Sequence, residues 1–192
     1  HRDLHSLRRR QRQMCIRDSH ASKASAEIYV KTFIDTYGLK AASFRLTGLY
    51  GERQFGGEDH GWVANFCVRT LLNLPLRIYG TGKQVRDILY AQDVVRAFEA
   101  FYNNPIPGIY NIGGGIKTAI SLLECIKLIS EISQKRPQIE FLPPRHGDLK
   151  YFVCDITKAR EVLKWEPKVL PKEGITNLIN WVRENIELFK QQ

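Results

Sequence analysis

Residues 76–90 read LRIYGTGKQVRDILY, in which two short apolar runs, Leu76–Tyr79 and Arg86–Tyr90, flank the turn Gly80-Thr81-Gly82. Leu76–Tyr79 lies between Pro75 and Gly80, and a short run between proline and glycine is typical of a β-strand. Arg86–Tyr90 is strand-like as well. Segments with helical periodicity lie on both sides of this stretch. Because strands alternate with helices, the sequence predicts an α/β or α+β fold.

The same alternation extends along most of the chain. Helices are expected at about residues 23–37, 62–73, 93–102, 122–133, 157–163 and 172–189. Further strands are expected at 41–47, 109–112, 139–142 and 151–154, and a glycine-rich loop at 48–61. Three helix ends carry their own signals: Gly38 follows the first helix, Asp93 could cap the third, and Ser121 with Glu124 forms a capping box.

The composition is that of a globular domain with 192 residues, 43% of them apolar and 26% charged. No apolar run approaches the roughly 20 residues that span a bilayer, and no apolar run follows the basic start as in a secretory signal. The four cysteines form no CxxC pair, and the five histidines do not cluster. The sequence therefore predicts a cytoplasmic protein with reduced thiols, no metal site and no membrane contact.

The net charge of +9 raises the possibility of nucleic-acid binding, but much of it is concentrated at the start of the chain. Residues 1–18 hold six Arg and two Asp, a net +4, which leaves +5 on the other 174 residues. That balance also suits an enzyme that binds a diphosphate. The distribution of charge therefore does not favour nucleic acid as a partner.

Residues 1–20 read HRDLHSLRRRQRQMCIRDSH and show no apolar periodicity. The part Met14–Ser19 looks like translated adaptor sequence, so the segment is expected to be non-native. A natural disordered arm is the alternative. An arm that grips RNA or a membrane is a third reading, but no aromatic residues interleave with the arginines.

A dinucleotide-binding domain normally opens with a strand, a glycine-rich turn and a helix. Nothing before Lys23 supplies that pattern. The triplets Gly80-Thr81-Gly82 and Gly113-Gly114-Gly115 are interpreted as turns.

Four motifs in order resemble the extended short-chain dehydrogenase/reductase superfamily of NAD-dependent nucleotide-sugar epimerases and dehydratases. They are Ala21-Ser22-Lys23, Phe44-Arg45-(x)4-Tyr50-Gly51, Ile78-Tyr79-Gly80-Thr81-Gly82-(x)3-Arg86-Asp87 and Tyr110-Asn111-Ile112-Gly113-Gly114. The resemblance runs from about Ser22 to the end and matches the second half of the family. It implies an incomplete Rossmann-type fold joined to a small α+β substrate-binding domain.

A narrower resemblance is to the CDP-paratose 2-epimerase (tyvelose epimerase) subfamily. It rests on Glu52-Arg53-Gln54-Phe55, Asp59-His60-Gly61-Trp62-Val63, Gly82-Lys83-Gln84-Val85-Arg86-Asp87, Pro144-Arg145-His146-Gly147-Asp148 and Val153-Cys154-Asp155-Ile156. The subfamily typically has Gln where this chain has His60. The resemblance implies a CDP-linked deoxyhexose as substrate, oxidised to a keto sugar by bound NAD and reduced again from the other face.

The family that this chain resembles has a catalytic pair, Tyr-x-x-x-Lys. In that pair the Lys lowers the pKa of the Tyr phenol and holds the nicotinamide ribose. Lys23 matches the Lys, but Ser19 stands at the position of the Tyr. A serine hydroxyl is too weak an acid for that role. The present chain is therefore expected to be inactive by itself.

The resemblance also implies a set of substrate-binding residues: Arg86 on the diphosphate, Arg145 on a phosphate or the ribose, Asp148 on sugar or ribose hydroxyls, Tyr79 and Leu76 at the base, and Gln54 at the sugar. Guanidinium groups suit phosphate because they can make two parallel hydrogen bonds to it. Each residue also has a structural reading. Arg86 could pair with Asp87, Leu76 and Ile78 could belong to the core, and Trp62 could anchor a helix start.

These inferences divide the chain into residues 1–20, a Rossmann remnant at 21–60, and a substrate domain at 61–192 with some elements that return to the Rossmann sheet. A homodimer is expected for the parent, because the helix at 23–37 resembles one in the family's dimer interface. Two alternatives stay open. One is a 4-epimerase or 4,6-dehydratase, and the other is a non-catalytic module that binds sugar nucleotides or nucleic acid.

Overall fold

The computed structural model describes residues 21–190, which form two compact units. The first comprises the described residues up to Phe44 together with Pro105–Tyr110, and the second comprises Arg45–Asn104 and the residues from Asn111 onward. The predicted boundary at residue 60, between a Rossmann remnant and a substrate domain, stays a prediction. The expectations for residues 1–20 lie outside the described residues.

The first unit contains the helix of residues 21–37, which agrees with the predicted helix. Gly38 has φ +64° and its amide donates to the carbonyl of Ile34 at 3.0 Å, the geometry of a left-handed helix end. Strand β1 (Ala42–Leu46) follows and pairs with β5 (Gly108–Ile112).

A second sheet is built around β4 (Val85–Tyr90), which pairs with β2 (Gly48–Tyr50), β6 (Ala119–Ser121) and β8 (Tyr151–Phe152). Strands β2 and β8 run parallel to β4, and β6 runs antiparallel. The expectation that residues 48–61 are entirely loop is wrong at its start. Residues 48–50 pair with 88–90, which buries the Tyr50 side chain.

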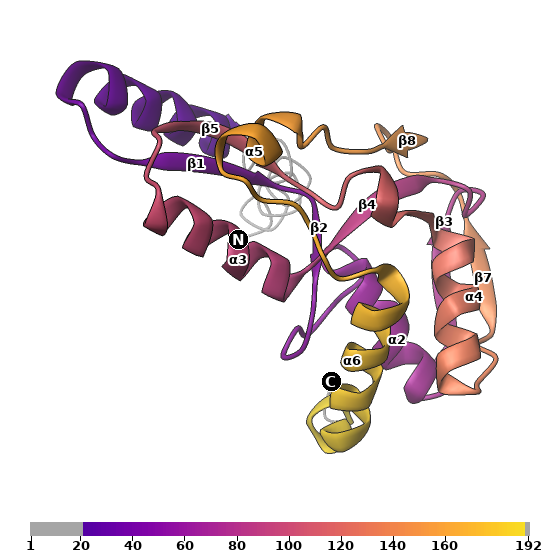
Figure 1. The fold of residues 1–192 in the computed structure, drawn as a ribbon. Coiled ribbons are helices and arrows are strands. Elements are labelled where there is room, and N and C mark those ends of the chain that lie inside the picture. Colours follow the sequence, from indigo (N-terminus) through magenta and orange to yellow (C-terminus); the bar gives the residue numbers. More distant parts are fainter. Residues whose placement is uncertain (1–20, 191–192) are drawn as a thin grey trace, which may run out of the picture. The chain divides into compact units, whose positions relative to one another are not determined.

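A third sheet consists of two parallel strands, β3 (Leu76–Tyr79) and β7 (Ile139–Leu142). Three helices pack on one another beside the strands: α2 (Trp62–Leu71), α4 (Leu122–Ser133) and α6 (Pro171–Glu184) (Figure 1). Their apolar faces form the core of the second unit with the buried side chains of the strands. The alternation of strands and helices confirms the α/β class.

The start of α4 follows its sequence signal closely. The Glu124 amide donates to the Ser121 hydroxyl at 3.2 Å, and the Ser121 amide donates to the Glu124 carboxylate at 2.8 Å. This reciprocal pair confirms the predicted capping box.

The final helix is shorter than predicted. Helix α6 ends at Glu184, Asn185 has the non-helical φ of −119°, and a 3₁₀ turn η2 (Ile186–Phe189) follows. Periodicity alone did not show the break, because Phe189 continues the apolar spacing and is buried.

Asp93 is not the cap of α3 (Ala91–Asn103), since Tyr90 holds the capping position without a side-chain hydrogen bond. Its buried carboxylate accepts the amides of Lys168 at 2.8 Å and Val169 at 3.0 Å, and it pairs with Arg96. Asp93 therefore ties α3 to the segment after α5 (Thr157–Val162). The sequence also did not indicate η1 (Ile116–Thr118) or β6.

Candidate functional site

A polar cluster lies where β4 begins beside the loop at residues 143–150. The Arg86 guanidinium donates to the Asp148 carboxylate at 2.6 Å, and both side chains are partly exposed. Gln84, two residues before Arg86, donates through its amide to Asp148 at 3.2 Å and to the Tyr79 carbonyl at 2.6 Å. The pairing of Arg86 and Asp148 leaves a half-buried guanidinium at a polar surface.

Arg145 extends the cluster from the same loop. Its guanidinium carbon lies 3.9 Å from the centre of the Tyr79 ring, a cation–π contact. Its Nη2 atom lies 3.1 Å from the Glu58 carbonyl oxygen and 3.1 Å from the Asp59 carboxylate. Arg145 is therefore held between an aromatic face and the loop at residues 54–61.

The loop at residues 54–61 is held by two further contacts. Arg77 on β3 lies 3.0 Å from Glu58 and 3.3 Å from Glu140 on β7, and the two carboxylates raise the pKa of its guanidinium. The Gln54 amide donates to the Leu49 carbonyl at 3.1 Å, while its buried carbonyl oxygen has no hydrogen-bond partner among residues 21–190. Gln54 thus fastens the start of the loop to β2.

Four of the predicted substrate residues lie in this cluster as two pairs, Arg86 with Asp148 and Arg145 with Tyr79. The pairs are joined by the Gln84 amide, which donates to Asp148 and to the Tyr79 carbonyl. The structure does not bring the side chain of Leu76 to this surface, because that side chain is fully buried, as is that of Ile78. Both are core residues, which is the structural reading given above. Trp62 packs its ring edge against Phe66 at the start of α2, as expected of a helix anchor.

Three residues of the cluster were not predicted: Gln84, Glu58 and Asp59. Gln84 could have been found, because alternate residues of a strand share a face and Gln84 precedes Arg86 by two positions. Glu58 and Asp59 lie in an irregular loop with no spacing rule. They are recognised only when the loop is placed against Arg77 and Arg145.

The alternative reading of Arg86, a pair with Asp87, is wrong. Asp87 is fully buried, and its Oδ2 accepts the Gly115 amide at 3.2 Å. A Cβ atom on Gly113 would lie 2.6 Å from that same Oδ2, and one on Gly114 would collide with the Thr118 hydroxyl. These glycines allow close packing around a buried carboxylate, and the negative charge of that carboxylate disfavours a phosphate there.

Among residues 21–190, neither glycine triplet leads into an α-helix: Gly80-Thr81-Gly82 precedes β4, and Gly113-Gly114-Gly115 precedes η1. The described residues therefore do not form the strand–turn–helix cradle that holds a dinucleotide pyrophosphate. Lys23, the predicted cofactor-binding residue, is exposed on the helix of the first unit. Its predicted partner position, Ser19, lies outside the described residues.

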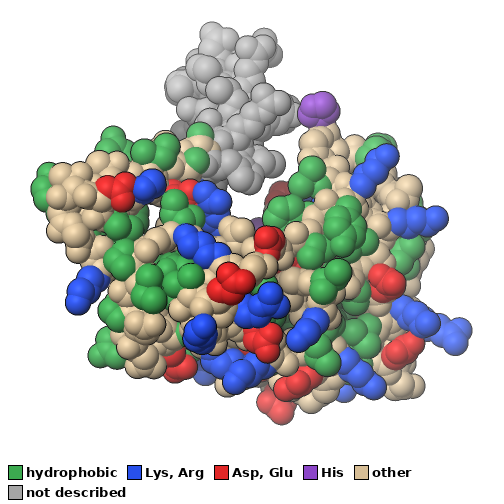
Figure 2. All heavy atoms as spheres, turned by 45° about the horizontal axis from the view of Figure 1, so that its top comes forward, with side chains coloured by type: hydrophobic (Ala, Val, Ile, Leu, Met, Phe, Trp, Pro, Cys, Tyr) green, Lys and Arg blue, Asp and Glu red, His purple; other side chains and the backbone are tan. Residues whose placement is uncertain are grey.

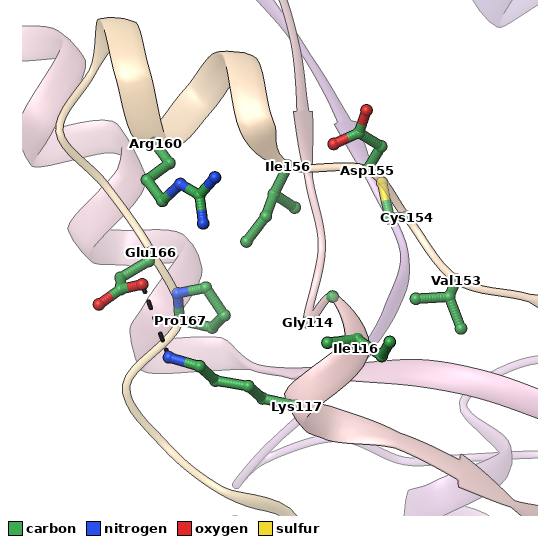
Figure 3. Close-up of a pocket in the computed structure, with 11 residues that line it drawn as sticks. Gly114, Ile116, Lys117, Val153, Cys154, Asp155, Ile156, Arg160, Glu166 and Pro167 are labelled. Carbon is green, nitrogen blue, oxygen red and sulfur yellow. Dashed lines mark ion pairs between the residues drawn. The ribbon is translucent and has the colours of Figure 1, made fainter.

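A separate pocket of ≈340 Å³ lies beside Gly114 and Gly115, on the Asp87 side of β4. Figure 3 shows Lys117 directed toward Glu166, 3.8 Å from its carboxylate, with Arg160 and Ile156 of the opposite wall facing the hollow. Cys154 also lines it, and burial together with Asp87 and Asp155 raises the pKa of that thiol to about 11. None of the predicted site residues lines this pocket.

Charged side chains of both signs are interspersed on the face shown in Figure 2, and no single-sign patch dominates it. Within residues 21–190, no three His, Cys, Asp or Glu side chains gather as a metal site would require. No helix in this part of the chain combines the length and the apolar character needed to cross a membrane.

Comparison with known proteins decides the family. The model of the NAD dependent epimerase/dehydratase family matches residues 18–113, which is half of the chain. The chain belongs to this family.

Among curated members of the epimerase/dehydratase family, the CDP-paratose 2-epimerase of Salmonella typhi is 38% identical over 168 residues, which cover 83% of this chain and 50% of that protein. The UDP-glucuronate 4-epimerase of Thermodesulfobacterium geofontis is 33% identical over 170 residues, covering 88% of this chain and 51% of that protein. The chain therefore spans about half the length of the curated relatives it matches.

Solved structures of the family agree on the fold. The UDP-glucose 4-epimerase of Thermotoga maritima, solved with UDP-glucose, superposes with a TM-score of 0.77 at 36% identity over 85% of this chain and 52% of that one. The Thermus thermophilus UDP-glucose 4-epimerase, solved with NAD, gives a TM-score of 0.77 at 35% identity, covering 85% and 53%. The resemblance to NAD-dependent nucleotide-sugar enzymes is thereby confirmed, and the fold is Rossmann-like.

Proposed function

We propose that the polar cluster is the nucleotide-sugar site of an NAD-dependent epimerase, and that the present chain carries the substrate half of that enzyme. The observation that carries the proposal is the convergence of Arg86 and Arg145 with Asp148 and Tyr79 on one surface. Two guanidinium groups can bind the diphosphate, the Asp148 carboxylate can accept ribose or sugar hydroxyls, and Tyr79 can stack on the base.

The proposed substrate is a CDP-linked deoxyhexose, epimerised at C2. The support is the 38% identity to the CDP-paratose 2-epimerase, together with the subfamily motifs that contain Gln54, Asp59 and Arg145. In the cluster Gln54 fastens the start of the loop at 54–61 to β2, and Asp59 pairs with the Arg145 guanidinium. The alternative within the same family is a 4-epimerase on a UDP sugar, as in the matched Thermotoga maritima enzyme.

Catalysis by this chain alone is not part of the proposal. The described residues form no dinucleotide cradle, and Ser19 replaces the tyrosine that would exchange a proton with the sugar hydroxyl. The unperturbed pKa of a tyrosine is about 10, within reach of tuning by a neighbouring Lys, whereas an aliphatic hydroxyl is a far weaker acid. We expect the chain to bind substrate without converting it.

The experiment is a calorimetric titration of the full 192-residue chain with CDP, UDP and dTDP. The proposal predicts saturable binding with CDP as the tightest ligand. Tightest binding of UDP would replace the 2-epimerase assignment with the 4-epimerase alternative. No binding of any diphosphate would contradict the proposal as a whole.

The proposed assembly of the whole enzyme is a homodimer. The helix of residues 21–37 exposes Ile28, Tyr29, Phe33 and Tyr37, with 66% of Ile28 and 73% of Tyr37 accessible. An apolar surface of this kind on a helix is typical of a protein–protein contact. Light scattering should show a concentration-dependent dimer that Ile28→Lys weakens, and a monomer at all concentrations would contradict the assembly.

A further inference from the structure

We infer that Asp59 is a competitor for the substrate phosphate: its carboxylate engages Arg145, and a phosphate of the nucleotide sugar must displace it in order to bind. Asp59 would thereby set the affinity of the site without contacting the substrate. The inference rests on the proposed function and adds to it a residue that weakens binding.

The geometry around Arg145 supports a competition. A terminal guanidinium nitrogen carries two hydrogens, and Nη2 of Arg145 has two oxygens within 3.1 Å, the Glu58 carbonyl and the Asp59 carboxylate. A phosphate that takes two parallel hydrogen bonds from Arg145 needs one of those hydrogens. The Asp59 carboxylate and the substrate phosphate therefore compete for hydrogens of the same Nη2 atom. The phosphate can form both of its hydrogen bonds to Arg145 only when an oxygen now on Nη2 leaves.

Asp59 is the partner that can leave. Its side chain is 82% exposed and that of Arg145 is 40% exposed, whereas Arg86 and Asp148 are 22% and 34% exposed. Exposed ion pairs are weak, and the loss of one changes an equilibrium by roughly two- to five-fold. A diphosphate carries more charge than one carboxylate and should win the exchange.

The exchange can be local, because the neighbouring residue is anchored independently. Glu58 keeps its ion pair with Arg77 at 3.0 Å when the Asp59 carboxylate leaves Arg145, and Gln54 keeps its hydrogen bond to the Leu49 carbonyl. The loop at residues 54–61 therefore stays attached to β2 and β3. Only the Asp59 carboxylate has to move into solvent.

The test compares the affinities of the 192-residue chain and of Asp59→Asn for CDP and for cytidine by calorimetry. The variant should bind CDP roughly two- to five-fold more tightly and cytidine with unchanged affinity, since cytidine has no phosphate. Glu140→Gln is the matched control, because it removes one negative charge from the same surface but leaves the Arg145 contacts in place. Its CDP affinity should change less than that of Asp59→Asn.

A second comparison isolates the pair itself. In an Arg145→Met background, Asp59→Asn should have no further effect on CDP affinity, because the competed donor is gone. The inference is overturned if Asp59→Asn leaves CDP binding unchanged, weakens it, or strengthens cytidine binding equally. If the unaltered chain does not bind CDP, the proposed function fails and this inference fails with it, whereas CDP binding that ignores Asp59 overturns the inference alone.

Discussion

The guanidinium of Arg86 lies 2.6 Å from the carboxylate of Asp148, although 62 residues separate the two positions. The pair joins the start of β4 to the loop after β7, and both side chains are only partly exposed. Its two members are the residues that the proposed function assigns to the diphosphate and to hydroxyl groups. The pair therefore links the stability of the loop to the organisation of the site.

Arg86→Met and Asp148→Asn should each lower the free energy of unfolding by about 0.5–1.5 kcal/mol, and the double variant should cost less than the sum because each single variant already breaks the pair. Urea unfolding of the three variants and the unaltered chain measures the coupling. Strictly additive losses would show that the two side chains contribute independently.

Gly114 should not tolerate a side chain. A Cβ atom there would collide with the Thr118 hydroxyl and the Ile88 carbonyl, so Gly114→Ala should cost about 3 kcal/mol or prevent folding. Gly57→Ala is the matched control, because its Cβ would first meet the ring of the exposed His60 at 3.2 Å. Thermal unfolding of both variants tests the contrast, and equal losses would refute the packing role assigned to Gly114.

The capping box of α4 should make stability depend on pH. The Ser121 hydroxyl and amide donate to Glu124 and lower the pKa of its carboxyl group. A lowered folded-state pKa stabilises the protein above the unfolded pKa of about 4.3, and this contribution is lost as the pH falls through the folded value. Ser121→Ala should therefore cost about 1 kcal/mol at pH 7 and less near pH 3.

Ser130→Ala on the same helix is the control for the capping box. The Ser130 hydroxyl donates to the Ile126 carbonyl at 2.8 Å, a contact without a titratable partner. Its effect on urea unfolding should be the same at both pH values. A cost of Ser121→Ala that does not vary with pH would contradict the assigned role of the Glu124 carboxylate.

The three described cysteines should react slowly with alkylating reagents. Burial raises the pKa of Cys67 and Cys125, and Cys154 has a pKa of about 11. Since the thiolate is the reactive form, Cys154 should be alkylated at pH 7.5 roughly 100-fold more slowly than an unperturbed thiol, and Cys67 and Cys125 only on unfolding. Peptide mass spectrometry resolves each site, and rapid labelling of Cys67 would contradict its buried position.

Local signals predicted much of the fold. The capping box of Ser121 and Glu124 and the left-handed end at Gly38 depend on neighbours within a few residues, and both appear as expected. Strand β6 was missed because three residues give too short a pattern, and it forms only by pairing with β4. Asp93 was misread because its partners, Lys168 and Val169, lie far along the chain.

In the candidate site, too, the sequence did not predict contacts between residues that lie far apart along the chain. Arg86, Arg145, Asp148 and Tyr79 were identified through the family resemblance, and in the structure they lie in one cluster as two pairs. Asp59 was not identified as a site residue, because its meaning depends on a loop that packs against Arg145. Leu76 was assigned to the base site because its strand carries the motif, but its side chain turns inward.

The central claim is that the polar cluster of Arg86, Arg145, Asp148 and Tyr79 binds a nucleoside diphosphate. The most direct test is to titrate CDP into the unaltered 192-residue chain and into its Arg86→Met and Arg160→Met variants. Arg160 lies in the separate pocket beside Gly114, so its substitution controls for the loss of one positive charge. The account predicts that Arg86→Met weakens CDP binding by roughly ten-fold or more while Arg160→Met leaves it unchanged. Equal affinities for all three proteins, or a loss confined to Arg160→Met, would contradict the account.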